Sequence, residues 1–413
     1  MRSARKLAIA LAVVLSACSW TQYRGNGQRT GGNPFAPGVD STTLHALTPT
    51  WTSIDHGAVG DEVVVRDGRV LFNGDTALWA LDLGTGDDLW HVDRTLTHQT
   101  HGILPATTWT ENSTTVVGMT QTWSDSVPGT SYFQLLAQTQ TVDLATGAVL
   151  GSEGVGGGTP PLEAGGWVYE PNTQIIAFPR GGSVVVDVHA RALDGGGAFT
   201  VPLAANVQIP SSLAVAGDRL YVRTRFGVIS VPAHGCGAPT CGPTWQTLMP
   251  NATVIGQIAV DRGVVFDLDQ AGKLTAIAAD GCAAFDCPPL WSTAATAYGG
   301  RGFAVVHDRA YVTAGPTLSV FDTAGCGAPV CSPLWTSTAP GLLSSPTIVN
   351  DVVFAGTDAG QLVAWKTSGC GAATCPTFWS QDQGGSVGPV SPIDHALVFP
   401  VGPAVRKLSV PRT

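Results

Sequence analysis

Eight cysteines in this chain form four pairs, each with four residues between its members. The pairs are Cys236/Cys241, Cys282/Cys287, Cys326/Cys331 and Cys370/Cys375. Cysteines at this spacing can close a small disulfide loop, or their thiolates can bind zinc or an iron–sulfur cluster. A metal site needs four ligands that converge on one point, whereas successive pairs stand 44 to 46 residues apart. The spacing favours four local disulfides, with free redox-active thiols as a further alternative.

The chain starts with the pattern of an export signal. Three basic residues stand within the first six positions, and the eleven residues 7–17 form an apolar stretch. This stretch is too short to cross a bilayer as a helix, but it fits the hydrophobic region of a signal peptide. Because paired cysteines of exported proteins form disulfides by default, the signal strengthens the disulfide interpretation.

The apolar stretch ends in Leu15-Ser16-Ala17-Cys18, which resembles the lipobox of bacterial lipoproteins. The resemblance implies cleavage before Cys18 and attachment of a diacylglycerol to its sulfur, and two acyl chains suffice for stable anchoring. A plain secretory signal with an incidental cysteine is the alternative. We expect residues 1–17 to be a lipoprotein signal peptide and residues 18–40 a lipidated N-terminal segment. The mature protein is then expected outside the cytoplasm, anchored to the cell membrane by lipid.

The sequence around the cysteine pairs repeats as well. Upstream of the last pair, residues 346–349, 352–357 and 361–366 predict three strands, with turns at Asn350-Asp351 and Asp358-Ala359-Gly360. A tryptophan follows each cysteine pair by four residues and marks a fourth strand. Four antiparallel strands in about 44 residues make one blade of a β-propeller.

The overall composition agrees with an all-β chain. Only 12% of the residues are charged, while 51 glycines and 28 prolines suit many short strands that are joined by tight turns. The formal net charge of -9 offers no basic surface for phosphates. We therefore expect no nucleic acid among the partners.

One stretch without cysteines carries the fullest form of the repeat. Residues 78–90 read Leu-Trp-Ala-Leu-Asp-Leu-Gly-Thr-Gly-Asp-Asp-Leu-Trp and resemble the blade signature of PQQ-like repeats. Residues 20–26, Trp-Thr-Gln-Tyr-Arg-Gly-Asn, are similar to an opening often seen in such propellers. The family includes quinoprotein dehydrogenases and BamB-type barrel-assembly lipoproteins. The resemblance implies that the closing tryptophans dock adjacent blades, and these are Trp51, Trp90, Trp245, Trp291, Trp335 and Trp379.

Counting the closing positions predicts eight blades within residues 41–413. Six are the tryptophans, and the segments near Leu150 and Phe199 supply two positions where no tryptophan stands. Residues 405–410 match a third strand at the end of the chain, while residues 44–51 form a fourth strand with no blade before it. We therefore predict an eight-bladed propeller whose last blade is closed by N- and C-terminal strands, which removes exposed sheet edges.

No constellation of residues predicts catalysis. Quinoprotein dehydrogenases hold their cofactor with calcium, carboxylate and amide ligands and often an adjacent cysteine pair, and none of these maps onto this chain. His98 and His101, with His91 and Asp93 nearby, are weak metal candidates in a polar stretch without helical pattern. Residues 267–272 faintly resemble a calcium loop, but their Asp and Gly suit a hairpin turn. We expect no catalytic, cofactor-binding or metal-binding residues and no cofactor.

Residues 91–205 depart from the regular repeat. Trp109, Trp123, Tyr132 and Phe133 stand there in a polar stretch, where they either form an exposed binding surface or, as we favour, fill the core between blades. The sequence predicts a monomeric, non-catalytic binding or scaffold protein of the cell envelope, whose partner is another protein or a glycan. A diverged quinoprotein dehydrogenase or a carbohydrate-acting or carbohydrate-binding propeller is the alternative.

Overall fold

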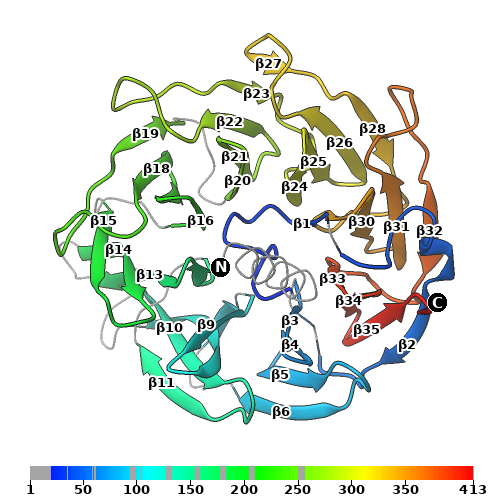
Figure 1. Ribbon diagram of the computed structural model, residues 1–413, viewed down its shortest axis with the longest axis horizontal. Helices are drawn as coiled ribbons and strands as arrows, with labels where there is room; N and C mark the ends of the chain where they lie inside the picture. The colour runs from blue at the N-terminus through cyan, green and yellow to red at the C-terminus, as the bar shows by residue number, and fades with distance from the viewer. Residues whose placement is uncertain are drawn as a thin grey trace, which may run out of the picture.

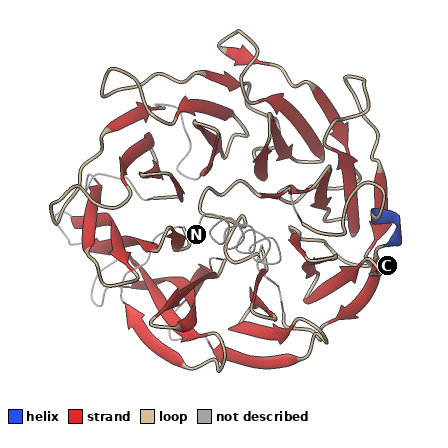
Figure 2. Ribbon diagram, in the orientation of Figure 1, coloured by secondary structure: helices blue, strands red, loops and turns tan. Residues whose placement is uncertain are grey.

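The computed structural model describes residues 20–34, 36–57, 59, 62–93, 99–103, 105–126, 133–153, 159–176, 183–203, 210–249 and 256–412. These residues form eight sheets of mainly antiparallel strands, arranged as blades around a central axis (Figure 1). One short 3-10 helix, η1 (Leu44–Ala46), is the helical element within the described part of the chain (Figure 2). The predicted all-β, eight-bladed propeller is confirmed.

The first strand of a blade lies nearest the axis, as β3 (Val64–Arg66) of blade 1 and β16 (Ser212–Ala216) of blade 4 show (Figure 1). Blade 1 has β3, β4 (Arg69–Asn73), β5 (Ala77–Asp82) and β6 (Asp88–Asp93). Blade 2 has β7 (Gln99–Ile103) and β8 (Thr107–Glu111), which both pair with β9 (Thr114–Ser126), then β10 (Phe133–Asp143) and β11 (Val149–Glu153). Blade 3 has β12 (Leu162–Ala164), β13 (Trp167–Ile176), β14 (Ser183–Ala192) and β15 (Ala198–Leu203), and blade 4 has β16, β17 (Arg219–Thr224), β18 (Gly227–Pro232) and β19 (Trp245–Leu248).

Blades 5 to 8 complete the ring, and two of them carry an extra two-residue parallel strand. Blade 5 has β20 (Gly256–Asp261), β21 (Val264–Asp269), β22 (Leu274–Ala278) and β23 (Trp291–Thr293), with β27 (Val330–Cys331) added outside. Blade 6 has β24 (Gly302–Val306), β25 (Arg309–Ala314), β26 (Thr317–Asp322) and β28 (Trp335–Thr338). Blade 7 has β1 (Gly32–Asn33) inside β29 (Thr347–Val349), then β30 (Val352–Gly356), β31 (Gln361–Lys366) and β32 (Trp379–Asp382). Blade 8 has β33 (Ser391–Ile393), β34 (Ala396–Val401), β35 (Ala404–Ser409) and β2 (Thr48–Thr52).

Blade 7 shows how the sequence directs each repeat. Its strands β29, β30 and β31 fall within one residue of the three strands that the pattern predicts. Asn350 lies in the turn between the first two strands with φ 53°, a left-handed conformation that asparagine tolerates better than most residues. Val353 and Val363 are fully buried against blade 6, where they share an apolar cluster with Leu318. Burial of such clusters between neighbouring sheets holds the blades together.

The two ends of the chain close the ring. Strand β2 pairs antiparallel with β35, with Thr48 opposite Ser409 and Thr52 opposite Arg406. The fourth strand of blade 8 therefore comes from the N-terminal part and its first three strands from the C-terminal part. The predicted closure is confirmed.

Blades 2 and 3 have the longest strands of the ring. β9 spans 13 residues and β10 spans 11, while β13 and β14 span 10 each. The predicted departure from the regular repeat in this part of the chain is confirmed.

Antiparallel pairing divides the connections between two faces of the ring. The turns between first and second strands lie on one face, which we call the turn face. The turns between second and third strands and the connections from blade to blade lie on the opposite face, which we call the funnel face. The connections between third and fourth strands return to the turn face at its outer rim, so the cysteine loops lie there.

Candidate functional site

All four predicted cysteine pairs form disulfides, with Cα–Cα distances of 5.6 to 5.8 Å; they are Cys236–Cys241, Cys282–Cys287, Cys326–Cys331 and Cys370–Cys375. Each loop also hydrogen-bonds to the outermost strand of the preceding blade. The amide of Cys241 donates to the carbonyl of Thr200 at 2.9 Å, and that of Cys375 to Thr336 at 2.8 Å. The other two loops pair in the same way with β19 and β23. The disulfide loops therefore join four successive pairs of blades, a role that the spacing of the cysteines did not reveal.

The second cysteine of each pair is buried, whereas the first is exposed. Cys287 is 4% exposed and lies in the apolar cluster between blades 4 and 5, together with Trp245. Its amide donates to the carbonyl of Gln246 on β19 at 2.7 Å. The second cysteines of the other pairs lie in the corresponding clusters between their own blades, and they are Cys241, Cys331 and Cys375. The four disulfides are local, as predicted, and Cys287 and its equivalents also pack between blades, where they contribute apolar surface to the interfaces.

Three of the predicted docking tryptophans donate a hydrogen bond to the next blade. The acceptors belong to the turns after the third strands of blades 1, 2 and 6. Trp51 Nε1 donates to the carbonyl of Leu83 at 3.0 Å, Trp90 Nε1 to Leu144 at 3.0 Å and Trp291 Nε1 to Thr323 at 3.3 Å. Each of these bonds ties the outermost strand of one blade to its neighbour.

The remaining closing positions dock by packing. Trp245 and Trp335 lie against Gly281 and Gly369 of the next blades, where an added Cβ would clash with the indole ring. Trp379 packs on the apolar cluster between blades 7 and 8. The ring of Phe199 lies against Gly235 of blade 4 in the same manner. By contrast, Leu150 is 57% exposed.

The other residues singled out by the sequence are not brought together. Trp109 is buried beside Val116 and Val168, as favoured, whereas the side chains of Trp123, Tyr132 and Phe133 lie outside the described part of the structure, as does Cys18. The exposed His91 ring stacks on Trp79 with centroids 4.6 Å apart. The positions of His98 and the His101 side chain are also outside what the structure describes. Among the described residues, no group of three His, Cys, Asp or Glu side chains could hold a metal ion.

The Asp-rich stretch at residues 267–272 is a hairpin turn, as expected. Asp269 Oδ1 accepts a hydrogen bond from the amide of Lys273 at 2.9 Å, across the turn between β21 and β22. Asp267 points elsewhere and pairs with Arg223 of blade 4. This ion pair between blades 4 and 5 was not predicted from the sequence.

Residues 20–34, which we call the axial segment, lie at the centre of the ring (Figure 1). They contact the innermost strands of blades 1 to 7 in chain order. Trp20 exchanges backbone hydrogen bonds with Val65, and the next two residues bond to Thr108 and Glu163. Four carbonyls then accept amide hydrogen bonds from blades 4 to 7 at 2.8 to 3.1 Å. These acceptors are Gly27, Gln28, Thr30 and Gly31, and the donors are Val215, Val260, Val305 and Ile348.

Three charged side chains are buried beside the axial segment. Arg24 and Arg29 are 2% exposed, and Glu62, from the loop before blade 1, is 3% exposed. Glu62 Oε1 accepts hydrogen bonds from the Arg24 amide at 3.0 Å and from the Trp20 indole. Arg24 Nη2 donates to two carbonyls, those of Phe303 and Pro346. Burial raises the pKa of the Glu62 carboxyl and lowers the pKa of Arg29 to about 10.

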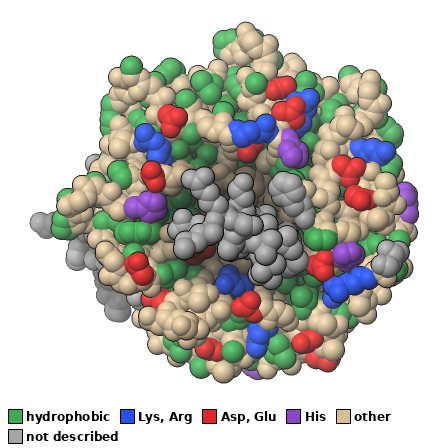
Figure 3. Space-filling model, in the orientation of Figure 1, with side chains coloured by type: hydrophobic (Ala, Val, Ile, Leu, Met, Phe, Trp, Pro, Cys, Tyr) green, Lys and Arg blue, Asp and Glu red, His purple; other side chains and the backbone are tan. Residues whose placement is uncertain are grey.

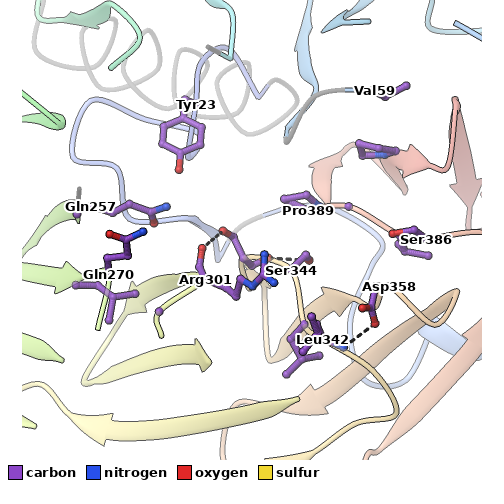
Figure 4. Close-up of a pocket in the computed structure, with 18 of the residues that line it drawn as sticks. Tyr23, Val59, Gln257, Gln270, Arg301, Leu342, Ser344, Asp358, Ser386 and Pro389 are labelled. Atoms are coloured by element: carbon purple, nitrogen blue, oxygen red, sulfur yellow. Dashed lines mark hydrogen bonds between the residues drawn. The ribbon is translucent and has the colours of Figure 1, made fainter. Parts of the chain in front are cut away.

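A cavity of about 530 Å³ opens on the funnel face and is lined by residues at the funnel-face ends of blades 5 to 8 (Figure 4). Its lining includes Tyr23 of the axial segment and several polar side chains, among them Gln257, Gln270, Arg301 and Ser344. The side-chain carbonyl oxygen of Gln257 is buried there and accepts no hydrogen bond from the described residues. A concave site with a few convergent polar groups suits a polar ligand or a loop of a partner protein.

On the side seen in Figure 3, the acidic and basic side chains of the described residues are interspersed. Within the described residues, no helix is long and apolar enough to cross a membrane.

These features define the fold as an eight-bladed β-propeller with four-stranded antiparallel blades. Quinohemoprotein alcohol dehydrogenase from Comamonas testosteroni shares it, with a TM-score of 0.68 and 12% identity over 96% of this chain and 82% of that one. BamB from Moraxella catarrhalis has a TM-score of 0.57 and 10% identity over 88% of this chain and 99% of that one. The computationally designed Ika8 protein has a TM-score of 0.59 and 11% identity over the same shares. At such identities the likeness shows the fold alone, and no protein-family profile and no curated protein matches the sequence.

The funnel cavity does not fit a calcium-bound quinone. Calcium needs six to eight oxygen ligands around one point, usually with several carboxylates. The two aspartates that line this cavity already accept backbone hydrogen bonds, Asp269 from Lys273 and Asp358 from the Leu342 amide at 2.7 Å. The groups that line the cavity therefore suit hydrogen bonding to a polar ligand and not coordination of calcium.

Proposed function

We propose that the mature chain is a lipid-anchored propeller outside the cytoplasm that binds a partner protein of the cell envelope and catalyses no reaction. One observation carries the proposal. Of the nine cysteines, eight are consumed in four disulfides, and the ninth, Cys18, stands in the lipobox-like sequence. Disulfides persist in oxidising compartments, which agrees with the export pattern at the start of the chain.

The buried charges support binding in preference to catalysis. Arg24, Glu62 and Arg223 hold parts of the ring together through hydrogen bonds and an ion pair. The carboxylates that line the funnel cavity accept hydrogen bonds from backbone amides. General acid–base work requires a titratable group within reach of a substrate. The funnel face instead offers polar side chains on a closed ring, which suits recognition of a partner.

Lipid attachment is tested on the protein expressed with its own N-terminus in a bacterial host. We expect the mature chain to begin at Cys18, to carry the mass of a diacylglyceryl group and to sediment with membranes. Cys18→Ala should remove both the lipid mass and the membrane association while leaving the propeller folded. A mature chain that starts at another residue, or a Cys18 without lipid, would contradict the anchor.

Partner binding is tested by placing a photo-crosslinking residue at Gln270 on the funnel face or at Asp308 on the turn face. We expect a discrete protein adduct in the envelope fraction from position 270 and none from position 308. Absence of adducts from both positions contradicts the proposal. PQQ and calcium provide the opposing test, because a saturable rise in melting temperature would favour the enzyme alternative.

A further inference from the structure

We propose that the turn face is the membrane face of the protein, so that the ring lies flat on the bilayer and the funnel face points away from it. This inference rests on the proposed lipid anchor at Cys18. It adds an orientation that assigns one face to the lipid surface and leaves the other to the partner.

The anchor is tied to the ring axis by a very short tether. Trp20 is 1% exposed and exchanges backbone hydrogen bonds with Val65 on β3, the innermost strand of blade 1. Its indole also donates to the buried carboxyl of Glu62. Cys18 precedes Trp20 by two residues, and two residues span at most about 7 Å. A lipid on Cys18 therefore holds the ring at its centre.

The direction of the chain selects the turn face. Strand β3 runs toward the turn at Asp67 and Gly68, and Trp20 pairs with it antiparallel. The chain therefore enters the axis from the turn face and runs on toward the funnel face. The four strands of a blade alone extend about 14 Å outward from the axis. A ring held at its centre by a tether of half that length lies flat and does not stand on its rim.

Exposed apolar side chains at the rim of the turn face agree with this orientation. Of 13 large hydrophobic side chains that are exposed in the described part of the chain, eight lie in cysteine loops or at the starts of fourth strands. Both places are on the turn-face rim. The eight are Leu89, Val149, Leu150, Phe285, Leu290, Val330, Leu334 and Phe378. Apolar side chains in this position gain free energy by contact with the interfacial region of a bilayer.

The described charged residues of the turn face do not form a basic patch. Aspartates at the turns, such as Asp218 and Asp308, alternate with Arg262 and with arginines beside other turns. Anionic lipid therefore adds little attraction, and the orientation should depend weakly on salt. The tether and the apolar rim set the orientation instead.

The orientation is measured on the lipidated full chain bound to vesicles that contain a nitroxide-headgroup lipid. A fluorophore is attached to one added cysteine, either Asp308→Cys on the turn face or Ala359→Cys on the funnel face; the eight ring cysteines are disulfide-bonded and Cys18 carries lipid. We expect the label at position 308 to be quenched several-fold more strongly than the label at position 359. Insertion of 20 Gly/Ser residues before Trp20 gives a tether of about 25 Å and should reduce the difference without reducing flotation.

The outcomes separate the orientation from the anchor. If the protein lacks the lipid mass and does not float with vesicles, the proposed function fails. If it floats but both labels are quenched equally, or position 359 is quenched more, the anchor stands and the orientation is overturned. A difference of equal size with the long linker would overturn the role assigned to the short tether.

Discussion

The carboxylate of Asp267 in blade 5 accepts a hydrogen bond from Nε of Arg223 in blade 4, 3.0 Å away, and both side chains are buried. The two residues stand 44 positions apart, on the second strands of successive blades. Burial raises the pKa of Asp267 to about 6, and the attraction of Arg223 offsets part of that rise. The pair thus ties two neighbouring blades through their interior.

Breaking this pair on one side should destabilise the fold strongly. Arg223→Met leaves the Asp267 carboxylate buried without its counter-charge, which costs about 3 to 5 kcal/mol of the free energy of unfolding at neutral pH. The double variant Arg223→Met with Asp267→Leu should be neutral or more stable. Urea unfolding measures both. A single-variant loss below about 1 kcal/mol would show that the pair is not isolated from water.

The same pair predicts a pH dependence of stability. The folded pKa of Asp267, about 6, lies above the ordinary value of 3.8 for this carboxyl, so between these values the folded state holds a proton that the unfolded state has released. The contribution of this group is therefore greatest below pH 4 and is lost as the pH rises through 6. Relative to the double variant, the wild-type protein should lose stability between pH 4 and pH 6. A relative gain over this interval would reverse the sign that burial requires.

Removal of one disulfide should weaken the ring only modestly. Closing a six-residue loop is worth about 2 kcal/mol by the chain-entropy argument. We expect the pair of changes Cys326→Ser and Cys331→Ser to lower the free energy of unfolding by at least that amount, because Cys331 also packs in the apolar cluster between blades 5 and 6, with the propeller still folded. The exposed neighbour Ser332→Ala serves as the matched control and should have almost no effect. Loss of folding in the paired variant would mean that the loop is required for the fold itself.

Variants at Trp291 separate the contributions that packing and hydrogen bonding make to docking by a tryptophan. Trp291→Phe keeps most of the ring but removes the bond to the Thr323 carbonyl, and should cost about 1 kcal/mol. Trp291→Ala also opens a cavity between blades 5 and 6 and should cost about 3 to 5 kcal/mol. Thermal or urea unfolding distinguishes the two. Equal losses for both variants would assign the whole effect to the hydrogen bond.

The repeat in the sequence was sufficient to predict the eight-bladed ring and its closure by the two termini. Tryptophans and cysteine pairs recur because each blade needs the same docking position, so their spacing counts the blades even where Phe199 replaces the tryptophan. The unmatched ends around Trp51 and Leu408 then imply that one blade is shared between the termini. The period of strand patterns carries this information without any knowledge of side-chain contacts.

The burial of one cysteine in each pair was not visible in the sequence. Cys282 and Cys287 lie in the same turn-rich segment. Their spacing shows that the two sulfurs can form a disulfide, but not which of them faces a neighbouring blade. Only the path of the loop along β19 places Cys287 against Trp245. The disulfide itself was therefore predictable, whereas its contribution to blade docking was not.

The axial segment and the buried ion pair could not be predicted in the same way. Gly27 and Gly31 contact the blades through their carbonyl oxygens, and every residue has such an oxygen, so no residue type signals the contact. Arg223 and Asp267 lie on the second strands of successive blades but one residue out of register, so the repeat pattern does not align them. Asp267 was also interpreted as part of the adjacent turn, which hid its pairing with Arg223.

The place of the axial segment along the ring axis can be measured by hydrogen exchange, and the membrane orientation depends on this placement. The amides of Trp20, Arg24, Gly25, Arg29, Thr30 and Gly31 donate hydrogen bonds within the ring. We expect a peptide covering residues 20–31 to exchange as slowly as the innermost strand β24. Exchange of this peptide at the rate of an unstructured chain, with β24 protected, would contradict the account.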